Sequence, residues 1–138
     1  MRVYNSKATS LPGTSYIEVV KVARKEHDKI EKLTKRRPYV KSVYFNKQKI
    51  FISLFWPHLI QKKLVVRTER LKLYSAAIDL MRNTRCEPIT LFTKTDLSTM
   101  THRFYGITKD KVEYCVQVKE NKRSGRKDFI SVYRQKAP

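Results

Sequence analysis

The stretch RFYGITKDKVEYCVQVKENKRSGRKDFISVYR, from Arg103 to Arg134, decides the fold. It contains three short runs rich in β-branched and aromatic residues: Arg103–Thr108, Val112–Glu120 and Phe129–Arg134. Polar turns separate them, first Lys109-Asp110-Lys111 and then a basic turn around Ser124-Gly125. Such runs with polar turns between them are typical of neighbouring antiparallel strands. We therefore expect a three-stranded antiparallel meander at the carboxyl end.

Alternation within this stretch predicts what each face of the sheet displays, because side chains two apart on a strand share a face. One alternate set is apolar and should face the helices: Tyr114, Val116, Val118, Ile130 and Val132. The other set should face solvent: Cys115, Gln117, Lys119, Phe129, Ser131 and Tyr133. For the first strand the sequence leaves both faces open. We place His102, Phe104, Gly106 and Thr108 on the solvent face because Ile107 suits a core.

Upstream of this stretch, the pattern predicts helices around a hairpin. Ser15, three residues before Glu18, has the spacing of a capping box, and apolar residues recur every three or four positions from 16 to about 35. Two β-prone runs, 40–45 and 50–55, indicate a hairpin, and a second amphipathic helix should run from about Pro57 to about Asn83. Residues 84–101 read as a long connection with a short strand at 89–92.

The expected fold class is α+β, with N-terminal helices packed on one face of a small antiparallel β-sheet, the C-terminal three- or four-stranded meander. A chain of 138 residues is sufficient for one core. We therefore expect a single domain over residues 1–138, with a helix and hairpin in 1–64 and a helix and sheet core in 65–138.

Charge defines the class of partner. The chain has 31 Lys and Arg against 12 Asp and Glu, a formal net charge of +19. A compact body with this excess repels itself, and a polyanion would relieve the repulsion. Nucleic acid is the expected partner because phosphate contacts release counterions. An anionic membrane or an acidic protein would satisfy the same electrostatics less specifically.

The two cysteines, Cys86 and Cys115, are far apart in sequence and have no second pair to complete a metal knuckle or a disulfide framework. We interpret both as free thiols and expect no metal and no cofactor. No run approaches the roughly 18 apolar residues of a membrane span, so no membrane partner is expected. The expected site of action is the cytoplasm, although a domain cut from a larger exported toxin would take its address from elsewhere.

Polar residues on the predicted solvent face suggest phosphodiester chemistry without a metal. An attacking 2′-hydroxyl must lose a proton and the leaving oxygen must gain one, which a group titrating near neutrality does best. His102 is the only histidine expected there, so we take it as the acid or base. Lys119 would neutralise phosphoryl oxygens, while Thr108, Ser131 and Tyr133 would donate hydrogen bonds. Because DNA lacks the internal nucleophile, the predicted substrate is RNA.

A second group of residues is expected to hold the nucleic acid rather than to react with it. Arg103 would share phosphate neutralisation, and Tyr105 and Tyr133 could stack on splayed bases. Charge makes two further pairs candidates, on the second helix and at the last turn: Arg67 with Arg70, and Arg126 with Lys127. Charges on a helix or in a turn are often merely solvated, so these four positions have a plain structural alternative.

Three quoted segments carry a resemblance: HRFYGIT (102–108), YCVQVKE (114–120) and FISVY (129–133). Together they resemble the sheet of the barnase-EndoU-colicin-RelE superfamily, in particular its phage and mobile-element branch. The resemblance covers roughly residues 65–134 and implies a small metal-independent ribonuclease, often a toxin, with helices before a four-stranded antiparallel sheet. It also implies an acidic antitoxin or immunity protein as a partner. The superfamily's usual acidic or second histidine partner has no clear counterpart here.

Two functions follow as expectations. The first is a metal-independent endoribonuclease of toxin type, which cleaves RNA by 2′-hydroxyl attack on the phosphodiester. The alternative is a non-catalytic basic module that binds RNA or DNA. Both depend on the same geometric condition, that His102, Thr108, Lys119 and Ser131 meet around a space the size of a phosphate.

Overall fold

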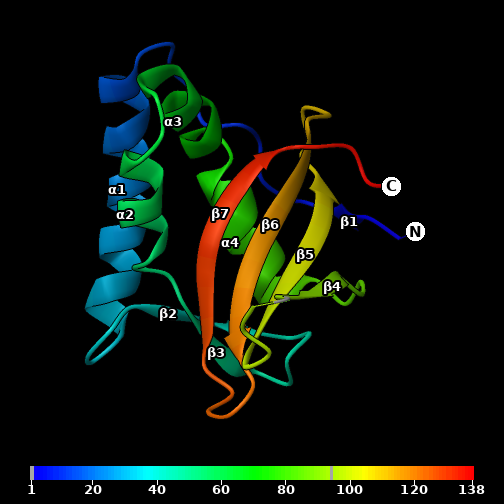
Figure 1. The fold of residues 1–138 in the computed structure, drawn as a ribbon. Coiled ribbons are helices and arrows are strands. Elements are labelled where there is room, and N and C mark those ends of the chain that lie inside the picture. The colour runs from blue at the N-terminus through cyan, green and yellow to red at the C-terminus, as the bar shows by residue number, and fades with distance from the viewer. Residues whose placement is uncertain (1, 94) are drawn as a thin grey trace.

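The structure, a computed structural model, describes residues 2–93 and 95–138 (Figure 1). Within these residues the chain forms four helices and seven strands, so the expected α+β class is confirmed. In chain order they are β1 (Tyr4–Asn5), α1 (Tyr16–Leu33), β2 (Tyr39–Ser42), β3 (Gln48–Phe51), α2 (Phe55–Ile60), α3 (Leu64–Leu71), α4 (Tyr74–Asn83), β4 (Ile89–Phe92), β5 (Thr99–Ile107), β6 (Glu113–Asn121) and β7 (Lys127–Arg134).

All seven strands belong to one mixed sheet. Its order is β1-β5-β6-β7-β3-β2, and β4 pairs with the other end of β5. The pairs β5–β6 and β6–β7 are antiparallel, whereas β1 joins β5 and β3 joins β7 in parallel. The expectation of a purely antiparallel C-terminal meander is therefore wrong. Strands from the first half of the chain form both edges of the sheet: β1 at one edge, and β3 and β2 at the other. Local sequence patterns do not predict these long-range pairings.

Helix α1 forms where the capping signal predicts it. The Glu18 amide donates to the Ser15 hydroxyl oxygen at 3.3 Å, which satisfies one of the free amides of the first turn. Four residues at helical spacing are buried along one stripe: Val19, Ala23, His27 and Ile30. The stripe packs on the core and fixes how the helix lies on the rest of the fold.

The second expected helix is wrong as one element. The chain instead forms α2, α3 and α4, separated by short breaks at 61–63 and 72–73. Phe55 of α2 stacks on Phe129 of β7, with ring centroids 4.7 Å apart and planes at 5°. Tertiary packing of this kind decides where the helical path turns, since neither break contains a proline or a glycine.

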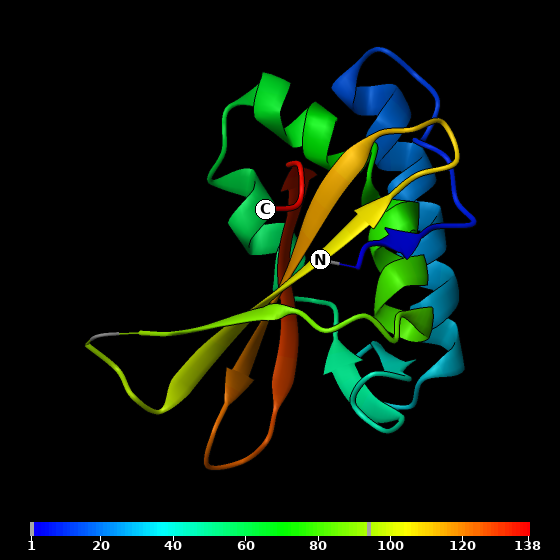
Figure 2. The ribbon, with the colours of Figure 1, turned by 90° about the vertical axis from the view of Figure 1, so that its right-hand side faces the viewer.

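The sheet has one covered face and one open face. Helix α4 lies behind β5, β6 and β7 in Figure 1, and none of the described helices crosses the face of these strands that is turned toward the viewer. After a quarter turn, α1 and α4 lie on the covered side of the strands (Figure 2), while α2 and α3 pack against β7. We call the covered side the helix face and the opposite side the open face.

A β-bulge in β7 changes which residues reach each face. Gln117 pairs with Ser131 but Val118 pairs with Phe129, so Ile130 is an extra residue in β7. Phe129 is fully buried on the helix face, and Ile130 is partly exposed. The expected placement of these two residues is therefore reversed. Tyr114, Val116, Val118 and Val132 do face the helices, as predicted.

Gly106 gives the central strands their close fit. It pairs with Tyr114, and a Cβ at position 106 would lie 2.6 Å from the Tyr114 ring and 3.0 Å from Leu80. We expect Gly106→Ala to lower the free energy of unfolding by about 2 kcal/mol through overpacking, measured by urea denaturation. Gly125→Ala is the comparison, because a Cβ at position 125 meets nothing within 4 Å. Only the backbone φ of +74° disfavours alanine there, and we expect it to lower the free energy of unfolding by about 1 kcal/mol. Equal urea midpoints for Gly106→Ala and the parent would contradict this packing.

A buried polar cluster joins α1 to α2 and α4. The Trp56 indole N–H donates to Nδ1 of His27 at 3.1 Å, and the Tyr74 hydroxyl lies 3.2 Å from the same nitrogen. An indole can only donate, so Nδ1 is unprotonated and His27 is held neutral in the core. Burial, followed by the nearby charge of Arg24, lowers the pKa of His27.

This cluster predicts a loss of stability in acid. Below about pH 6.5, the ordinary pKa of histidine, the unfolded chain takes up a proton that folded His27 refuses, so stability falls as the pH decreases. One such group contributes at most about 1.4 kcal/mol per pH unit. We expect His27→Gln to flatten the dependence of melting temperature on pH between about 7.5 and 5.5. Parallel curves for the variant and the parent would show that His27 is not the group responsible.

Candidate nucleic-acid interface

The open face of β5, β6 and β7 carries two cross-strand rows of polar and aromatic residues. Residues directly opposite each other in a sheet share a face, so the pairings define each row. The first row is Arg103, Gln117 and Ser131, and the second is Tyr105, Cys115 and Tyr133. The sequence predicted all but Gln117 and Cys115 as site residues.

Hydrogen bonds organise the first row. The Ser131 hydroxyl donates to the side-chain oxygen Oε1 of Gln117 at 3.1 Å, and the side-chain nitrogen Nε2 of Gln117 donates to the Tyr133 hydroxyl at 3.0 Å. Gln117 therefore links the two rows and fixes the orientation of both hydroxyl groups. Sequence reasoning missed it as a site residue because its role depends on the cross-strand register.

Arg103, at the β5 end of this row, stands out because its charge is unpaired. Within residues 2–93 and 95–138 it forms no salt bridge, and its Nε is the one buried side-chain nitrogen or oxygen that has no hydrogen-bond partner. A buried donor without a partner costs stability. A guanidinium held in this way can form a charge-assisted pair with phosphate.

The second row places aromatic rings beside the guanidinium. Tyr133 is partly exposed, and the Arg70 guanidinium of α3 lies 5.3 Å from its ring centroid. Burial raises the pKa of Tyr133 to about 12, so its hydroxyl keeps its proton at neutral pH. Burial also raises the pKa of Cys115, which remains a thiol beneath the rings. Tyr105 is only 5% exposed, so Tyr133 is the better placed ring for stacking on a base.

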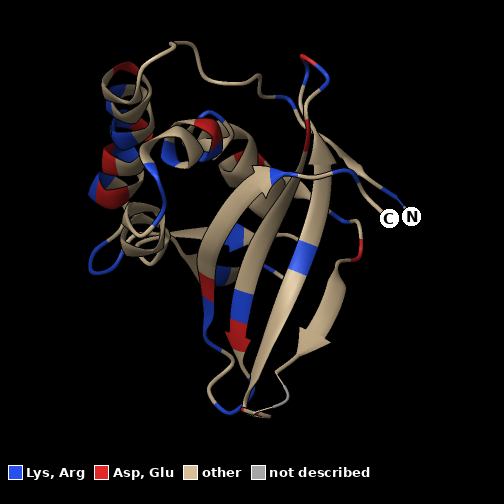
Figure 3. Cartoon of the chain, turned by 45° about the horizontal axis from the view of Figure 1, so that its top comes forward, with Lys and Arg blue, Asp and Glu red and all other residues tan. Residues whose placement is uncertain are grey.

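A third row extends the open face toward the β6–β7 turn. Lys119 is exposed and pairs with Thr101 on one side and Asp128 on the other. Asp128 is already engaged, since Arg126 Nε lies 3.2 Å from its carboxylate. Figure 3 shows basic positions on the strands, helices and loops, with fewer acidic ones among them. The middle of the open face therefore has a surplus of positive charge.

His102 does not lie on this face, and its expected meeting with Lys119 and Ser131 is wrong. It pairs with Val118, which points toward the helices, and it is only 7% exposed. Its Nε2 lies 2.7 Å from Glu120, and the Thr90 hydroxyl lies 2.8 Å from its Nδ1. A carboxylate can only accept, so Nε2 donates to Glu120. Both ring nitrogens are thus occupied in a buried network.

The same network contains Lys127, which was expected to grip a nucleic-acid backbone. Lys127 is 4% exposed and donates from Nζ to Gln48 at 2.6 Å and to the Gly125 carbonyl at 2.8 Å. Nζ also lies 3.6 Å from Glu120. This prediction is wrong because the lysine points inward, where it ties β7 to the end of the β2–β3 hairpin.

Thr108 is also absent from the open-face cluster. It is 2% exposed, and its hydroxyl accepts the Val112 amide at 2.8 Å across the turn that follows β5. The Thr108 amide in turn donates to the Val112 carbonyl at 3.0 Å. Thr108 therefore closes a turn, and its expected meeting with Lys119 and Ser131 is wrong.

Of the two arginines predicted on the second helix, only Arg70 reaches the open face. Arg67 donates from Nη2 to the Ile60 carbonyl at 2.6 Å and from Nε to the Lys62 carbonyl at 2.8 Å. It thus satisfies free carbonyls at the end of α2, a structural role. Charge patterning selected both residues, but only tertiary packing distinguishes them.

No family model, curated protein sequence or solved structure matches this chain. The resemblance of its C-terminal strands to the barnase-EndoU-colicin-RelE superfamily therefore stays a prediction. In the part of the chain that the structure describes, no three His, Cys, Asp or Glu residues gather to hold a metal ion. Over the same residues, none of the helices combines the length and the apolar character needed to cross a membrane.

Proposed function

We propose that this protein binds single-stranded RNA on the open face of its sheet. The observation that carries the proposal is the unpaired Arg103 guanidinium in a row with Gln117 and Ser131, beside the accessible ring of Tyr133. The guanidinium is suited to a backbone phosphate, and the ring to a splayed base.

Two features favour single-stranded RNA over duplex DNA. Sequence-tolerant binding of single strands uses stacking rings within a basic surface, which is the composition of this face. The side-chain amide of Gln117, which is partly exposed, can also donate a hydrogen bond to a 2′-hydroxyl. The net charge of +19 adds a sequence-independent attraction that salt weakens.

A second candidate function, metal-independent RNA cleavage, uses the same face. Tyr133 keeps its proton at neutral pH, and Arg103 is close enough to influence its titration. In this reaction the 2′-oxygen bonds to phosphorus and loses its proton to water. The bond to the 5′-oxygen breaks, and that oxygen takes a proton from Tyr133, which water then restores. Arg103 and Lys119 would neutralise the charge that develops on the phosphoryl oxygens.

One preparation of protein tests both candidates. Fluorescence anisotropy with a labelled oligouridine of about 20 nucleotides should show binding whose logarithm falls linearly with the logarithm of salt concentration. A labelled DNA duplex of equal charge should bind more weakly. No anisotropy change at low salt would contradict the proposal. Incubation of the same RNA in EDTA, followed by analysis for 2′,3′-cyclic phosphate ends, tests cleavage, and intact RNA would leave binding as the function.

A further inference from the structure

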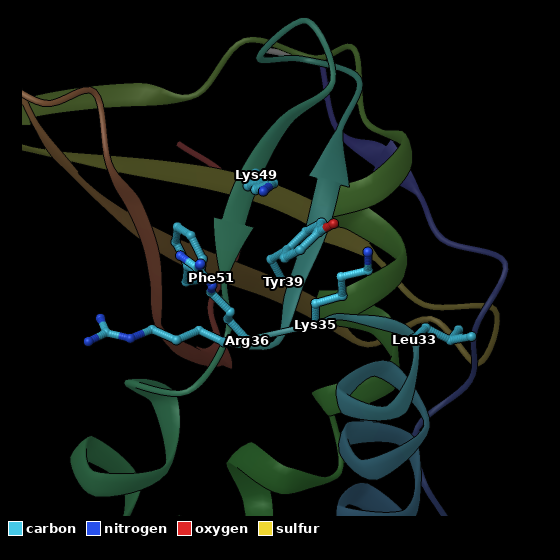
Figure 4. A pocket seen from close by; sticks show the side chains of 7 residues that line it. Leu33, Lys35, Arg36, Tyr39, Lys49 and Phe51 are labelled. Carbon is cyan, nitrogen blue, oxygen red and sulfur yellow. The ribbon is translucent and has the colours of Figure 1, made fainter.

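A cavity next to the outer strands β2 and β3 is not part of the interface proposed above. This cavity, of about 620 Å³, lies between the end of α1 and the β2–β3 hairpin (Figure 4). It is lined by Leu33, Lys35, Arg36, Arg37, Tyr39, Lys49 and Phe51. A second hollow of about 440 Å³, beside the β6–β7 turn, shares Lys49 and Phe51 with it. Because they share these residues, we treat both as one groove, the hairpin groove.

Strand register connects the hairpin groove to the open face. Phe51 of β3 pairs with Asp128 of β7, and Tyr39 of β2 pairs with Phe51. Asp128 itself pairs with Lys119 on the open face. Paired residues share a face, so Tyr39 and Phe51 continue the surface that carries Arg103. Figure 4 shows the side chains of Tyr39 and Phe51 side by side on the two hairpin strands.

The groove is cationic and aromatic along its whole length. Five of its lining residues are Lys or Arg, and neither hollow is lined by Asp or Glu: the five are Lys35, Arg36, Arg37, Lys49 and Arg126. Lys49 Nζ lies 4.5 Å from the Tyr39 ring centroid, and the Arg126 guanidinium lies 4.7 Å from that of Phe51. Each ring thus has a cation over it, an ammonium at Tyr39 and a guanidinium at Phe51. A base can stack on the Phe51 ring and the guanidinium plane together.

We infer that the hairpin groove holds a second segment of the same RNA strand, an inference that rests on the proposed function. Backbone phosphates would lie against Arg36 and Arg37, and a base would stack on Tyr39 or Phe51. One strand would then run from Arg103 across β7 to the hairpin. An RNA too short to reach from Arg103 to the hairpin groove should therefore gain no affinity from the groove.

The test compares RNA lengths in a charge-matched pair of variants. Arg36→Ala/Arg37→Ala removes two exposed groove charges, and Lys21→Ala/Lys25→Ala removes two exposed charges from α1. Anisotropy is measured with oligouridines of about 6 and about 20 nucleotides, lengths that bracket a single binding surface. For the groove variant we expect roughly tenfold weaker binding of the long RNA and a salt slope smaller by about 1.4. Binding of the short RNA should change less than about twofold, and the α1 variant should behave like the parent with both RNAs.

The outcomes separate this inference from the function on which it rests. If the long RNA binds the groove variant and the parent equally, the inference fails and RNA binding on the open face stands. If the parent binds neither RNA, both fail. A polyglutamate chain serves as the acidic-protein probe. Binding of polyglutamate that requires Arg36 and Arg37, with RNA binding unaffected by them, would assign the groove to an acidic partner and overturn the inference.

Discussion

Replacing Arg103 with alanine is expected to weaken single-stranded RNA binding about ten- to a hundredfold, the range for one lost hydrogen bond to a charged group. The guanidinium supplies the unpaired positive charge in the middle of the open face, next to Gln117. A two-pronged contact with phosphate needs this planar group, so Arg103→Lys should restore only part of the affinity. Anisotropy with the labelled oligouridine measures each variant.

The melting temperature of Arg103→Ala distinguishes a loss of RNA affinity from misfolding of the variant. Because Nε of Arg103 is buried without a partner, its removal deletes an unsatisfied donor. The melting temperature of Arg103→Ala should therefore stay within about 2 °C of the parent or rise. Arg82→Ala is the matched control, since Arg82 is exposed and belongs to α4, the helix on the covered side of the sheet (Figure 2). Equal affinities for the Arg103 and Arg82 variants would remove the basis of the proposed interface.

If the open face also cleaves RNA, the same variant should lose more activity than affinity. Charge at phosphorus grows in the transition state, so a group that neutralises it matters more there than in the bound complex. We expect cleavage by Arg103→Ala at saturating RNA to fall at least about a hundredfold. Cleavage that follows affinity alone would show that Arg103 binds RNA without assisting the reaction.

The sequence predicted the local elements because their signals are local. Ser15 and the three-and-four spacing placed α1, which ends at Leu33, near its expected end. The β-prone runs corresponded to β2 and β3, which form the expected hairpin, and to β4, β5, β6 and β7. The parallel pairings of β1 with β5 and of β3 with β7 could not be predicted in this way. Each pairing consists of only two residue pairs, and these join distant parts of the chain.

Face assignment failed for a physical reason. Alternation identifies the solvent side only when one side is exposed, yet Cys115 and Tyr105 on the open face are as buried as Val116 and Phe104 on the helix face. The pattern of β5 was therefore ambiguous, and its orientation was chosen on Ile107 alone. The bulge at Ile130 then reversed the alternation in the part of β7 that precedes it, so that Phe129 faces the helices. Of the four predicted catalytic residues, only Lys119 and Ser131 lie on the open face.

The network around His102 leads to the second large expected effect. His102 joins β5 to β4 through Thr90 and to β6 through Glu120, and its ring centroid lies 5.2 Å from that of Phe45. Its removal leaves a carboxylate in a partly buried position without one of its partners. We expect His102→Ala to lower the free energy of unfolding by about 3 kcal/mol, measured by urea denaturation. Thr90→Val, which removes only the Nδ1 partner, should cost about 1 kcal/mol.

The same variant decides between a structural and a catalytic histidine. At a temperature where both proteins are folded, His102→Ala should bind single-stranded RNA within about twofold of the parent, because His102 pairs with Val118 of the helix face and its two ring nitrogens are bound to Thr90 and Glu120. Any cleavage activity should likewise remain. A general acid or base would show the opposite pattern, an unchanged urea midpoint with activity at least about a hundredfold lower. That pattern would return the reaction to His102 and require the β4–β5 region to open around it.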